Sequence, residues 1–269
     1  IDDPVHHYLT EFAKPPYAKI TIHHLMTHTS GLPRTPEGEI GSIQWNSMSK
    51  TATPVGNYVR LAVQMPLKSD PGSNYLYSNF GFRVLSALIA RVSGMSYADY
   101  MEQNIFEPLG MKNTGVARLD QPASESRIAE GLTLESLQAD GPTYSNGERG
   151  RNFGTGFGSG GIFASAGDLV KWDRILTGDE LLTKAQKKRL FQPVHGNYAC
   201  GWKVERLPLD ERLSHSHSGS NQGFFSKMMR LPEEELVIVI VGNVNASDAM
   251  DEVIDQLLRL CCSVPYRNP

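Results

Sequence analysis

Hydrophobic residues recur at helical spacing in several parts of the chain. Between Phe82 and Ser93 the apolar positions fall on one face of a helix, and Gly94 supplies a stop signal. A capping pattern at Ser165 opens another amphipathic stretch, which Gly178 closes. The same signals predict four more helices: residues 20–30 with Thr21 as N-cap and Gly31 near the end, 96–107 from Ser96 to the residue before Pro108, 183–191 from Thr183, and 247–261.

The C-terminal third has a different pattern, in which short β-rich runs alternate with turn residues. The runs cover residues 198–207, 212–217, 223–231 and 236–243. They predict an antiparallel meander that the helix at 247–261 closes. The longest apolar run, Leu236–Val241, is far shorter than the roughly 20 residues needed to span a membrane, so we interpret it as a buried strand.

These elements together predict an α+β fold, with an antiparallel sheet flanked by helices and a mainly helical region beside it. We interpret residues 1–269 as a single domain, mainly helical at about 15–190, with the sheet and the C-terminal helix at 191–269. Residues 122–157 are polar, rich in Gly, Ser and Asn, and show no sustained period. That composition is typical of a long surface excursion near a cleft.

Charge and cysteine content exclude several classes of function. The 26 basic and 29 acidic residues give a net charge of −3 and form no basic run that could follow a phosphate backbone, so nucleic acid is not an expected partner. Cys200, Cys261 and Cys262 predict neither a disulfide framework nor a CxxC metal site. The sequence starts at Ile1 with no targeting signal from which a compartment could be inferred.

Tyr77 and Asn79 are the first candidates for chemistry, because they stand two residues apart just before a predicted helix. This spacing can direct a phenol and an amide into the same cleft. A tyrosine in a positive environment can serve as a general base, and an asparagine offers a donor and an acceptor to a substrate amide. The alternative is a packed tyrosine and a turn-forming asparagine.

Other candidates have structural interpretations that we prefer. Ser159 lacks the first glycine of a Gly-x-Ser-x-Gly elbow, since Phe157 stands there, and fits a close-packed glycine turn better. His24 and His28 are four residues apart, as metal ligands can be, but no Glu completes the pattern, which favours a structural or capping role. His215 and His217 would share one face of a strand, where a metal pair is conceivable.

Five motifs occur together in one order along the chain. They are His24-Leu-Met-Thr-His-Thr-Ser-Gly-Leu-Pro33, Tyr77-Ser78-Asn79, Glu107-Pro-Leu-Gly-Met111, the segment from Gly160-Gly161 to Asp168, and His217-Ser-Gly-Ser220. The set resembles the serine β-lactamase-like superfamily, especially class C β-lactamases, low-molecular-weight penicillin-binding proteins and family VIII esterases. The resemblance covers nearly the whole chain and implies a β-lactamase/transpeptidase-like fold.

The resemblance also implies roles for individual residues. Tyr77 would assist proton transfer, with Ser78 as a spacer, and Asn79 would contact the substrate. His217-Ser218-Gly219, between two predicted strands, takes the place of the family's Lys-Thr-Gly. Gly219 would then allow substrate to approach the backbone, and the N–H of Ser220 would be one oxyanion donor. A hairpin His-Ser-Gly without such a role is the alternative interpretation.

In the family, the nucleophile is a Ser-x-x-Lys serine at the start of a buried helix. That element precedes the equivalent of Asp2-Asp3-Pro4, so we expect the nucleophile upstream of Ile1 and the fold to be incomplete at its N-terminus. The one literal match, Ser47-Met48-Ser49-Lys50, follows the Thr29-Ser-Gly motif in a loop-like region. We interpret it as a decoy.

The predicted function is therefore hydrolysis of a small-molecule or peptide ester or amide through a serine acyl-enzyme, with no cofactor and no metal. A non-catalytic binding protein or pseudoenzyme is the alternative. Histidine in place of lysine weakens a substrate-carboxylate anchor. This favours an esterase or D-peptidase over an efficient β-lactamase, unless Arg60 or Lys203 supplies the charge. The resemblance favours a periplasmic or secreted location and leaves the oligomeric state open.

Overall fold

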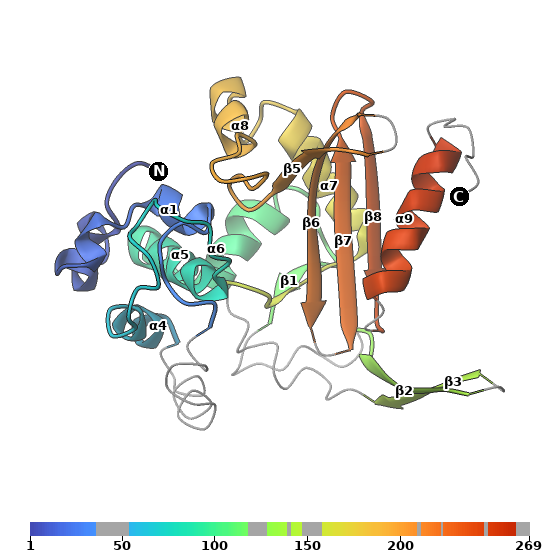
Figure 1. Ribbon diagram of the computed structural model, residues 1–269, viewed down its shortest axis with the longest axis horizontal. Coiled ribbons are helices and arrows are strands. Elements are labelled where there is room, and N and C mark those ends of the chain that lie inside the picture. The colour runs from blue at the N-terminus through green and yellow to red at the C-terminus, as the bar shows by residue number, and fades with distance from the viewer. Residues whose placement is uncertain are drawn as a thin grey trace. The chain divides into compact units, whose positions relative to one another are not determined.

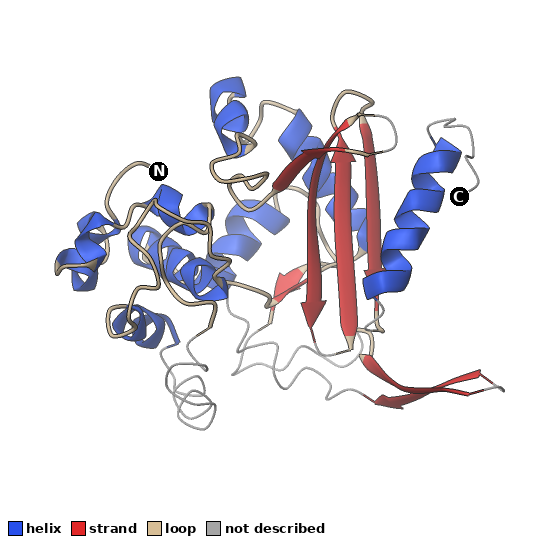
Figure 2. Cartoon of the chain, in the orientation of Figure 1, coloured by secondary structure: helices blue, strands red, loops and turns tan. Residues whose placement is uncertain are grey.

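The computed structural model describes residues 1–35, 54–117, 128–138, 141–146, 158–208, 211–221, 223–244 and 247–261. The chain forms two compact units. Unit 1 comprises Ile1–Ala123, Gly150–Phe163 and Gln192–Gly201, and unit 2 comprises Ser124–Arg149, Ala164–Phe191 and Trp202–Pro269. Both helices and antiparallel sheets are present, which confirms the predicted α+β class (Figures 1 and 2).

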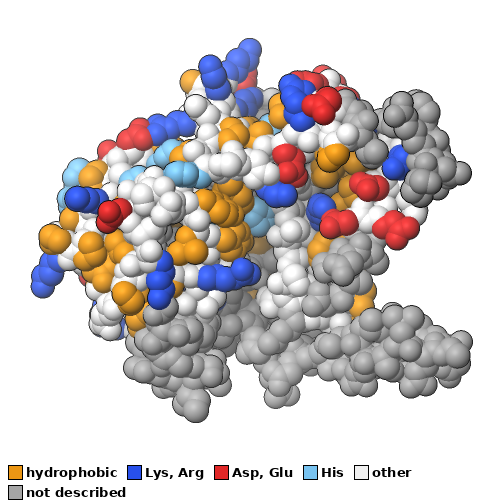
Figure 3. All heavy atoms as spheres, in the orientation of Figure 1, with side chains coloured by type: hydrophobic (Ala, Val, Ile, Leu, Met, Phe, Trp, Pro, Cys, Tyr) orange, Lys and Arg blue, Asp and Glu red, His pale blue; other side chains and the backbone are white. Residues whose placement is uncertain are grey.

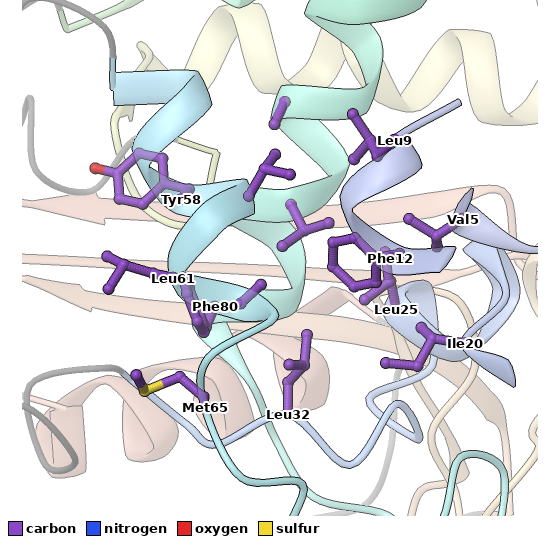
Figure 4. Packing of buried hydrophobic residues seen from close by; sticks show 14 residues of the cluster. Val5, Leu9, Phe12, Ile20, Leu25, Leu32, Tyr58, Leu61, Met65 and Phe80 are labelled. Carbon is purple, nitrogen blue, oxygen red and sulfur yellow. The ribbon is translucent and has the colours of Figure 1, made fainter. Parts of the chain in front are cut away.

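Unit 1 is mainly helical. Its elements are η1 (Val5–His7), η2 (Thr10–Ala13), η3 (Tyr17–Lys19), α1 (Ile22–Met26), α4 (Pro54–Ala62), α5 (Asn79–Ser93), α6 (Tyr97–Met101), the π-helical η4 (Glu102–Phe106), and the short strands β1 (Gly115–Val116) and β4 (Ile162–Phe163). The two strands pair antiparallel, Gly115 with Phe163. The N-terminal 3-10 helices, α1, α4 and α5 surround one hydrophobic core (Figure 4).

Side chains far apart in the sequence meet in that core. Phe12, Leu25, Tyr58 and Phe80 come from η2, α1, α4 and α5, and each is at most 1% exposed (Figure 4). Full burial of side chains of this size contributes roughly 1.5–3 kcal/mol each. The core therefore holds the start of α5 against α1.

Local signals set the helix ends. Ser78 caps α5, and Gly94 ends it, as predicted, and adopts the left-handed conformation, at φ 71°. Ser96 caps α6 through the N–H of Asp99, also as predicted. Helix α1 is shorter than the predicted 20–30, because the chain leaves the helix after Met26 and His28 adopts a positive φ of 56°.

Unit 2 combines a four-stranded sheet with three helices. The sheet has the order β5 (Lys203–Arg206), β6 (Leu213–Asn221), β7 (Phe224–Leu231), β8 (Leu236–Gly242), all antiparallel, which is the predicted meander. The helices are α7 (Ala166–Thr177), α8 (Lys184–Leu190) and α9 (Ser247–Cys261), with caps at Ser165 and Thr183 as expected. Figure 1 shows α9 running beside β8.

The two faces of this sheet pack against different helices. Met229, Leu231 and Ile238 lie on one face and pack with Ile254 and Leu258 of α9. The opposite face carries Arg230, whose guanidinium pairs with Asp173 of α7. This alternation along each strand follows from the period of two in a β-strand.

Two predictions about the β structure were incomplete. The segment at 122–157 contains a hairpin, β2 (Leu132–Gln138) paired with β3 (Gly141–Asn146), where the sequence predicted only an irregular excursion. Strand β6 runs on to Asn221 rather than ending at His217. Both hairpins form through cross-strand pairing, which a pass along one segment at a time does not detect.

Figure 3 shows charged side chains of both signs interspersed over the described residues of the face in view. Within the described part of the chain, no helix is both long and apolar enough to cross a membrane. Cys200 and Cys261 form no disulfide within the described part of the chain, and Cys262 lies outside it.

Candidate active site

Tyr77 and Asn79 stand on either side of a fully buried serine at the start of α5. Ser78 is the N-cap of the helix, and its hydroxyl accepts from the N–H of Gly81 (3.0 Å) while donating to the carbonyl of Pro33 (2.7 Å). Ser78 is therefore more than the spacer predicted from the sequence. Its two hydroxyl bonds fix the backbone between the two candidate residues.

His28 holds the same segment from the other side. The N–H of Ser78 donates to His28 Nδ1 (3.0 Å), and the N–H of Leu76 donates to the His28 carbonyl (2.8 Å). His28 Nε2 lies 3.1 Å from the hydroxyl of Tyr198. The residues before and after Tyr77 are thus both bound to one buried histidine.

Aromatic rings surround His28. Its ring centroid lies 4.1 Å from that of Tyr77, 5.0 Å from Phe82 and 5.0 Å from Tyr198. Tyr75 also contacts Tyr198, at 5.2 Å between centroids, and is 42% exposed. The cluster gives Tyr77 a packed inner side, so its ring has little freedom to change rotamer.

The electrostatics of Tyr77 combine burial with one nearby positive charge. Burial raises the pKa of Tyr77, and the positive charge of Arg34 opposes this rise. The Arg34 guanidinium carbon lies 5.5 Å from the Tyr77 ring centroid, a cation–π distance. Tyr77 consequently keeps its proton at neutral pH and can donate it.

Asn79 is the first residue of α5 and is half-buried. Within the described residues its side-chain amide makes no hydrogen bond to the protein. An amide two residues from Tyr77 in the chain, with its donor and acceptor not engaged by other described residues, suits contact with a substrate.

His217, Gly219 and Ser220 lie inside strand β6 in unit 2, not between two strands as predicted. They pair with Met228, Ser226 and Phe225 of β7. The pairing of β5 with β6 stops at Ser216. Ser218, Gly219 and Ser220 are exposed, so this part of the strand is open to approach by a ligand. Tyr77 and Asn79 belong to unit 1.

The space at Gly219 and the charge of His217 both bear on substrate choice. A Cβ at Gly219 would lie 2.7 Å from Ser226 Oγ, a side chain that can rotate away. Burial lowers the pKa of His217, and a hydrogen bond with the backbone of Ser218 opposes the shift. His217 is therefore neutral at pH 7 and offers no permanent cation to a carboxylate.

The two side chains proposed from the sequence to replace the charge of the family's lysine both bind other residues. Arg60 donates to Asn57 Oδ1 at 2.5 Å on α4, and Lys203 pairs with Glu205 at 3.4 Å. Arg34, which no sequence pattern indicated, is the cation beside Tyr77.

The remaining candidates have structural contacts. Ser159 Oγ accepts from Arg83 Nε (3.1 Å), and a Cβ at Gly158 would lie 2.5 Å from Ser86 Oγ, which confirms the close-packed glycine turn. His24 Nδ1 accepts from the N–H of Thr21, in a capping box. No cluster of three or more metal-ligating side chains occurs among the described residues. Ser47 and Lys50 lie outside them.

Sequence reasoning missed His28 and Tyr198 as parts of the site. Tyr198 was included in a predicted strand, and it lies 170 positions from His28. The signals that pointed to His28 were the ordered His24–Pro33 motif and its spacing from His24, and neither indicated a contact with Tyr198.

Comparison with known proteins identifies the family of the chain. The sequence matches the protein family described as Beta-lactamase over residues 1–260. Penicillin-binding protein 4* of Bacillus subtilis (strain 168) is 29% identical, over 94% of this chain and 57% of that protein. The D-alanyl-D-alanine-carboxypeptidase/endopeptidase AmpH of Escherichia coli (strain K12) is 26% identical, over 96% of this chain and 69% of that protein.

A solved structure described as a penicillin binding protein from Bacillus halodurans has the same fold. It superposes with a TM-score of 0.73 at 24% identity, covering 95% of this chain and 78% of that one. The predicted β-lactamase/transpeptidase-like fold is confirmed. The chain spans less than two thirds of penicillin-binding protein 4*.

Proposed function

The chain belongs to the beta-lactamase family, and from that premise we propose that it forms part of a serine hydrolase that cleaves an ester or amide through an acyl-enzyme. The observation that carries this proposal is the placement of Tyr77 and Asn79 on both sides of the buried cap Ser78. The attacking serine is proposed to be the Ser-x-x-Lys serine that the family resemblance implies, upstream of Ile1.

The proposed reaction has two steps. The serine oxygen bonds to the substrate carbonyl carbon, its proton passes to a base, and the carbonyl electrons move to the oxygen. Collapse of this intermediate breaks the bond to the leaving group, to which Tyr77 gives a proton. The base then passes the serine's proton to Tyr77, so that both groups return to their starting states. Because burial raises the pKa of Tyr77, the phenol is in the form that this donation requires. Water then releases the acid and restores the serine.

Three further residues are proposed to bind the substrate or the oxyanion in these steps. Asn79 is proposed to hydrogen-bond the substrate beside the scissile bond, and the N–H of Ser220 to stabilise the oxyanion. Gly219 presents no side chain to a ligand that approaches β6. The exposure of residues 218–220 supports this assignment.

The proposed substrate is an ester or a peptide amide rather than a carboxylated β-lactam. A neutral His217 at the family's lysine position supports this preference. The named activity of AmpH, a D-alanyl-D-alanine carboxypeptidase and endopeptidase, makes peptides that contain D-residues the first substrates to test.

The test uses the parent protein, expressed with its flanking coding sequence. It is exposed to a fluorophosphonate and to a fluorescent penicillin, and intact mass and peptide mapping locate the label. We expect one label on an upstream Ser-x-x-Lys serine. Tyr77→Phe should slow labelling by about 10²–10⁴-fold, whereas Tyr100→Phe, a control on α6, should leave the rate unchanged.

A label on Ser47 would refute an upstream nucleophile but would still support a serine hydrolase. The absence of any label on folded parent protein would favour the alternative, a non-catalytic binding protein. Equal rates for the Tyr77→Phe and Tyr100→Phe variants would remove Tyr77 from the mechanism.

A further inference from the structure

We propose that His28 is a positioning residue for Tyr77, which it holds by binding the backbone on both sides of that tyrosine. This inference rests on the proposed function, because it concerns how the proposed proton donor is kept in place. His28 itself touches no reacting atom in this proposal.

The first observation is that His28 uses its main chain and its side chain on one segment. Its carbonyl accepts from the N–H of Leu76 (2.8 Å) and its Nδ1 from the N–H of Ser78 (3.0 Å). These are the two neighbours of Tyr77 in the chain. The left-handed conformation of His28, φ 56°, is uncommon for a residue other than glycine. A structure retains such a conformation where surrounding contacts stabilise it.

The second observation fixes the protonation state of the ring. A backbone N–H can only donate, so Nδ1 of His28 must be the acceptor and carries no proton. In a neutral imidazole the proton is then on Nε2, which donates to the hydroxyl of Tyr198 at 3.1 Å. Both ring nitrogens are thereby used, which leaves neither to act as a base toward substrate or as a metal ligand.

The third observation is that Tyr198, which binds His28, is itself buried and held in place. Its side chain is 5% exposed, and burial raises its pKa, so the hydroxyl stays protonated. The segment that carries it is tied to α1, since the N–H of Gly201 donates to the carbonyl of Met26 (3.0 Å). His28 therefore links the Tyr77 segment to a part of the unit that is itself fixed.

The ring of His28 also contacts the ring of Tyr77. Their centroids are 4.1 Å apart at an interplanar angle of 41°. The backbone on both sides of Tyr77 and one face of its ring thus depend on the same residue, and the His28 side chain provides the bond to Ser78 and the ring contact. A shift of about 1 Å in a proton donor can cost 10²-fold in rate, so loosening this link should slow catalysis.

The experiment compares three variants in the parent protein. His28→Phe keeps a ring but removes both side-chain hydrogen bonds. His28→Asn places an amide oxygen near the Nδ1 position and suits a positive φ. Tyr198→Phe removes only the hydroxyl that accepts from Nε2. His195→Asn, which removes a histidine bound to the Gly72 carbonyl at 3.0 Å, is the matched control.

We expect the acylation rate to fall about 10–100-fold in His28→Phe, to recover in part in His28→Asn, and to fall less in Tyr198→Phe. The decisive measurement is a double-mutant cycle with Tyr77→Phe. If His28 acts through Tyr77, His28→Phe should cost almost nothing further in the Tyr77→Phe background. Folded state is checked for each variant by thermal unfolding.

Additive losses in the cycle would overturn the inference, because a general loss of stability does not depend on Tyr77. Loss of activity in His195→Asn equal to that in His28→Phe would overturn it too. If His28→Phe does not fold, the cycle with Tyr198→Phe decides the question in the same way. A Tyr77→Phe variant with full activity contradicts the proposed function itself, which separates the two failures.

Discussion

At the scale of single residues, two glycines with the same backbone conformation have different surroundings. Gly31 and Gly94 both have positive φ, 77° and 71°. A Cβ at Gly31 would lie 2.2 Å from the carbonyl oxygen of Ser69, whereas a Cβ at Gly94 would meet nothing within 4 Å. An alanine would therefore be strained at both positions, and only at Gly31 would its Cβ also clash with the backbone.

We predict that Gly94→Ala lowers the free energy of unfolding by about 1–2 kcal/mol, the cost of placing a Cβ in the left-handed region. Gly31→Ala should cost at least about 2 kcal/mol more, since the overlapping atom is backbone and cannot rotate away. Urea unfolding of both variants measures the difference. Equal losses would mean that the chain around Ser69 moves without penalty.

Charge at single residues also decides what the site can recognise. Arg34 is stacked over Tyr77, whereas the cations proposed from the sequence, Arg60 and Lys203, are bound to Asn57 and Glu205. Sequence gives the number of cations but not their partners. The guanidinium beside Tyr77 became evident only from the fold.

At the scale of elements, the start of α5 combines a structural and a functional role. Ser78 caps the helix, and the Ser78 hydroxyl also satisfies the buried carbonyl of Pro33. Ser96 caps α6 in an exposed position, and in the part of the chain that the structure describes it makes no such second bond to a distant segment. Both serines are helix N-caps, but substitution of Ser78 should affect stability and activity more than substitution of Ser96.

We predict that Ser78→Ala lowers the free energy of unfolding by about 2–4 kcal/mol, from the lost cap and the unsatisfied carbonyl. The acylation rate of the parent protein should fall as well, since Tyr77 and Asn79 adjoin the cap. Ser96→Ala should cost about 1 kcal/mol and leave the rate unchanged. Thermal unfolding and labelling kinetics test both; a Ser78→Ala variant with full activity would separate the cap from the site.

At the scale of the whole molecule, stability in acid should depend on a buried histidine in unit 2. His215 is 6% exposed, its ring stacks on Phe191 at 4.0 Å between centroids, and its Nδ1 finds no hydrogen-bond partner among the described residues. Burial, helped by the charge of Arg230, lowers the pKa of His215 to about 4. Asp173 of α7 pairs with that arginine, and His217 lies two residues along the same strand.

The direction of the pH effect follows from this lowered pKa. Above pH 6.5 the histidine is neutral in both folded and unfolded chains, and its contribution is complete. As the pH falls from 6.5 to 4 the unfolded chain takes up the proton first, so the free energy of unfolding decreases, by up to about 3 kcal/mol. Below pH 4 this group causes no further loss.

We predict that His215→Phe flattens the stability profile between pH 6.5 and 4 relative to the unsubstituted protein. Phenylalanine keeps the stack on Phe191 and cannot be protonated. The difference between the two urea-unfolding profiles isolates this group from the carboxylates that titrate in the same range. Parallel profiles would show that His215 is protonated without penalty in the folded chain.

The amino-acid sequence by itself determined several of the helix ends and the fold class. The caps at Ser96, Ser165 and Thr183, the stop at Gly94 and the bounds of α9 were predicted correctly. These features depend on hydrogen bonds and hydrophobic spacing within a few residues. The meander was evident for the same reason, since each strand carries its own pattern.

Tertiary structure alone decided the features that join distant segments. The extension of β6 to Asn221 comes from its pairing with β7, and the β2–β3 hairpin also forms through cross-strand pairing. The link from Ser78 through His28 to Tyr198 spans 50 and 170 positions of sequence. A pattern local to the chain contains no signal for such contacts, because their energy comes from residues that only folding brings together.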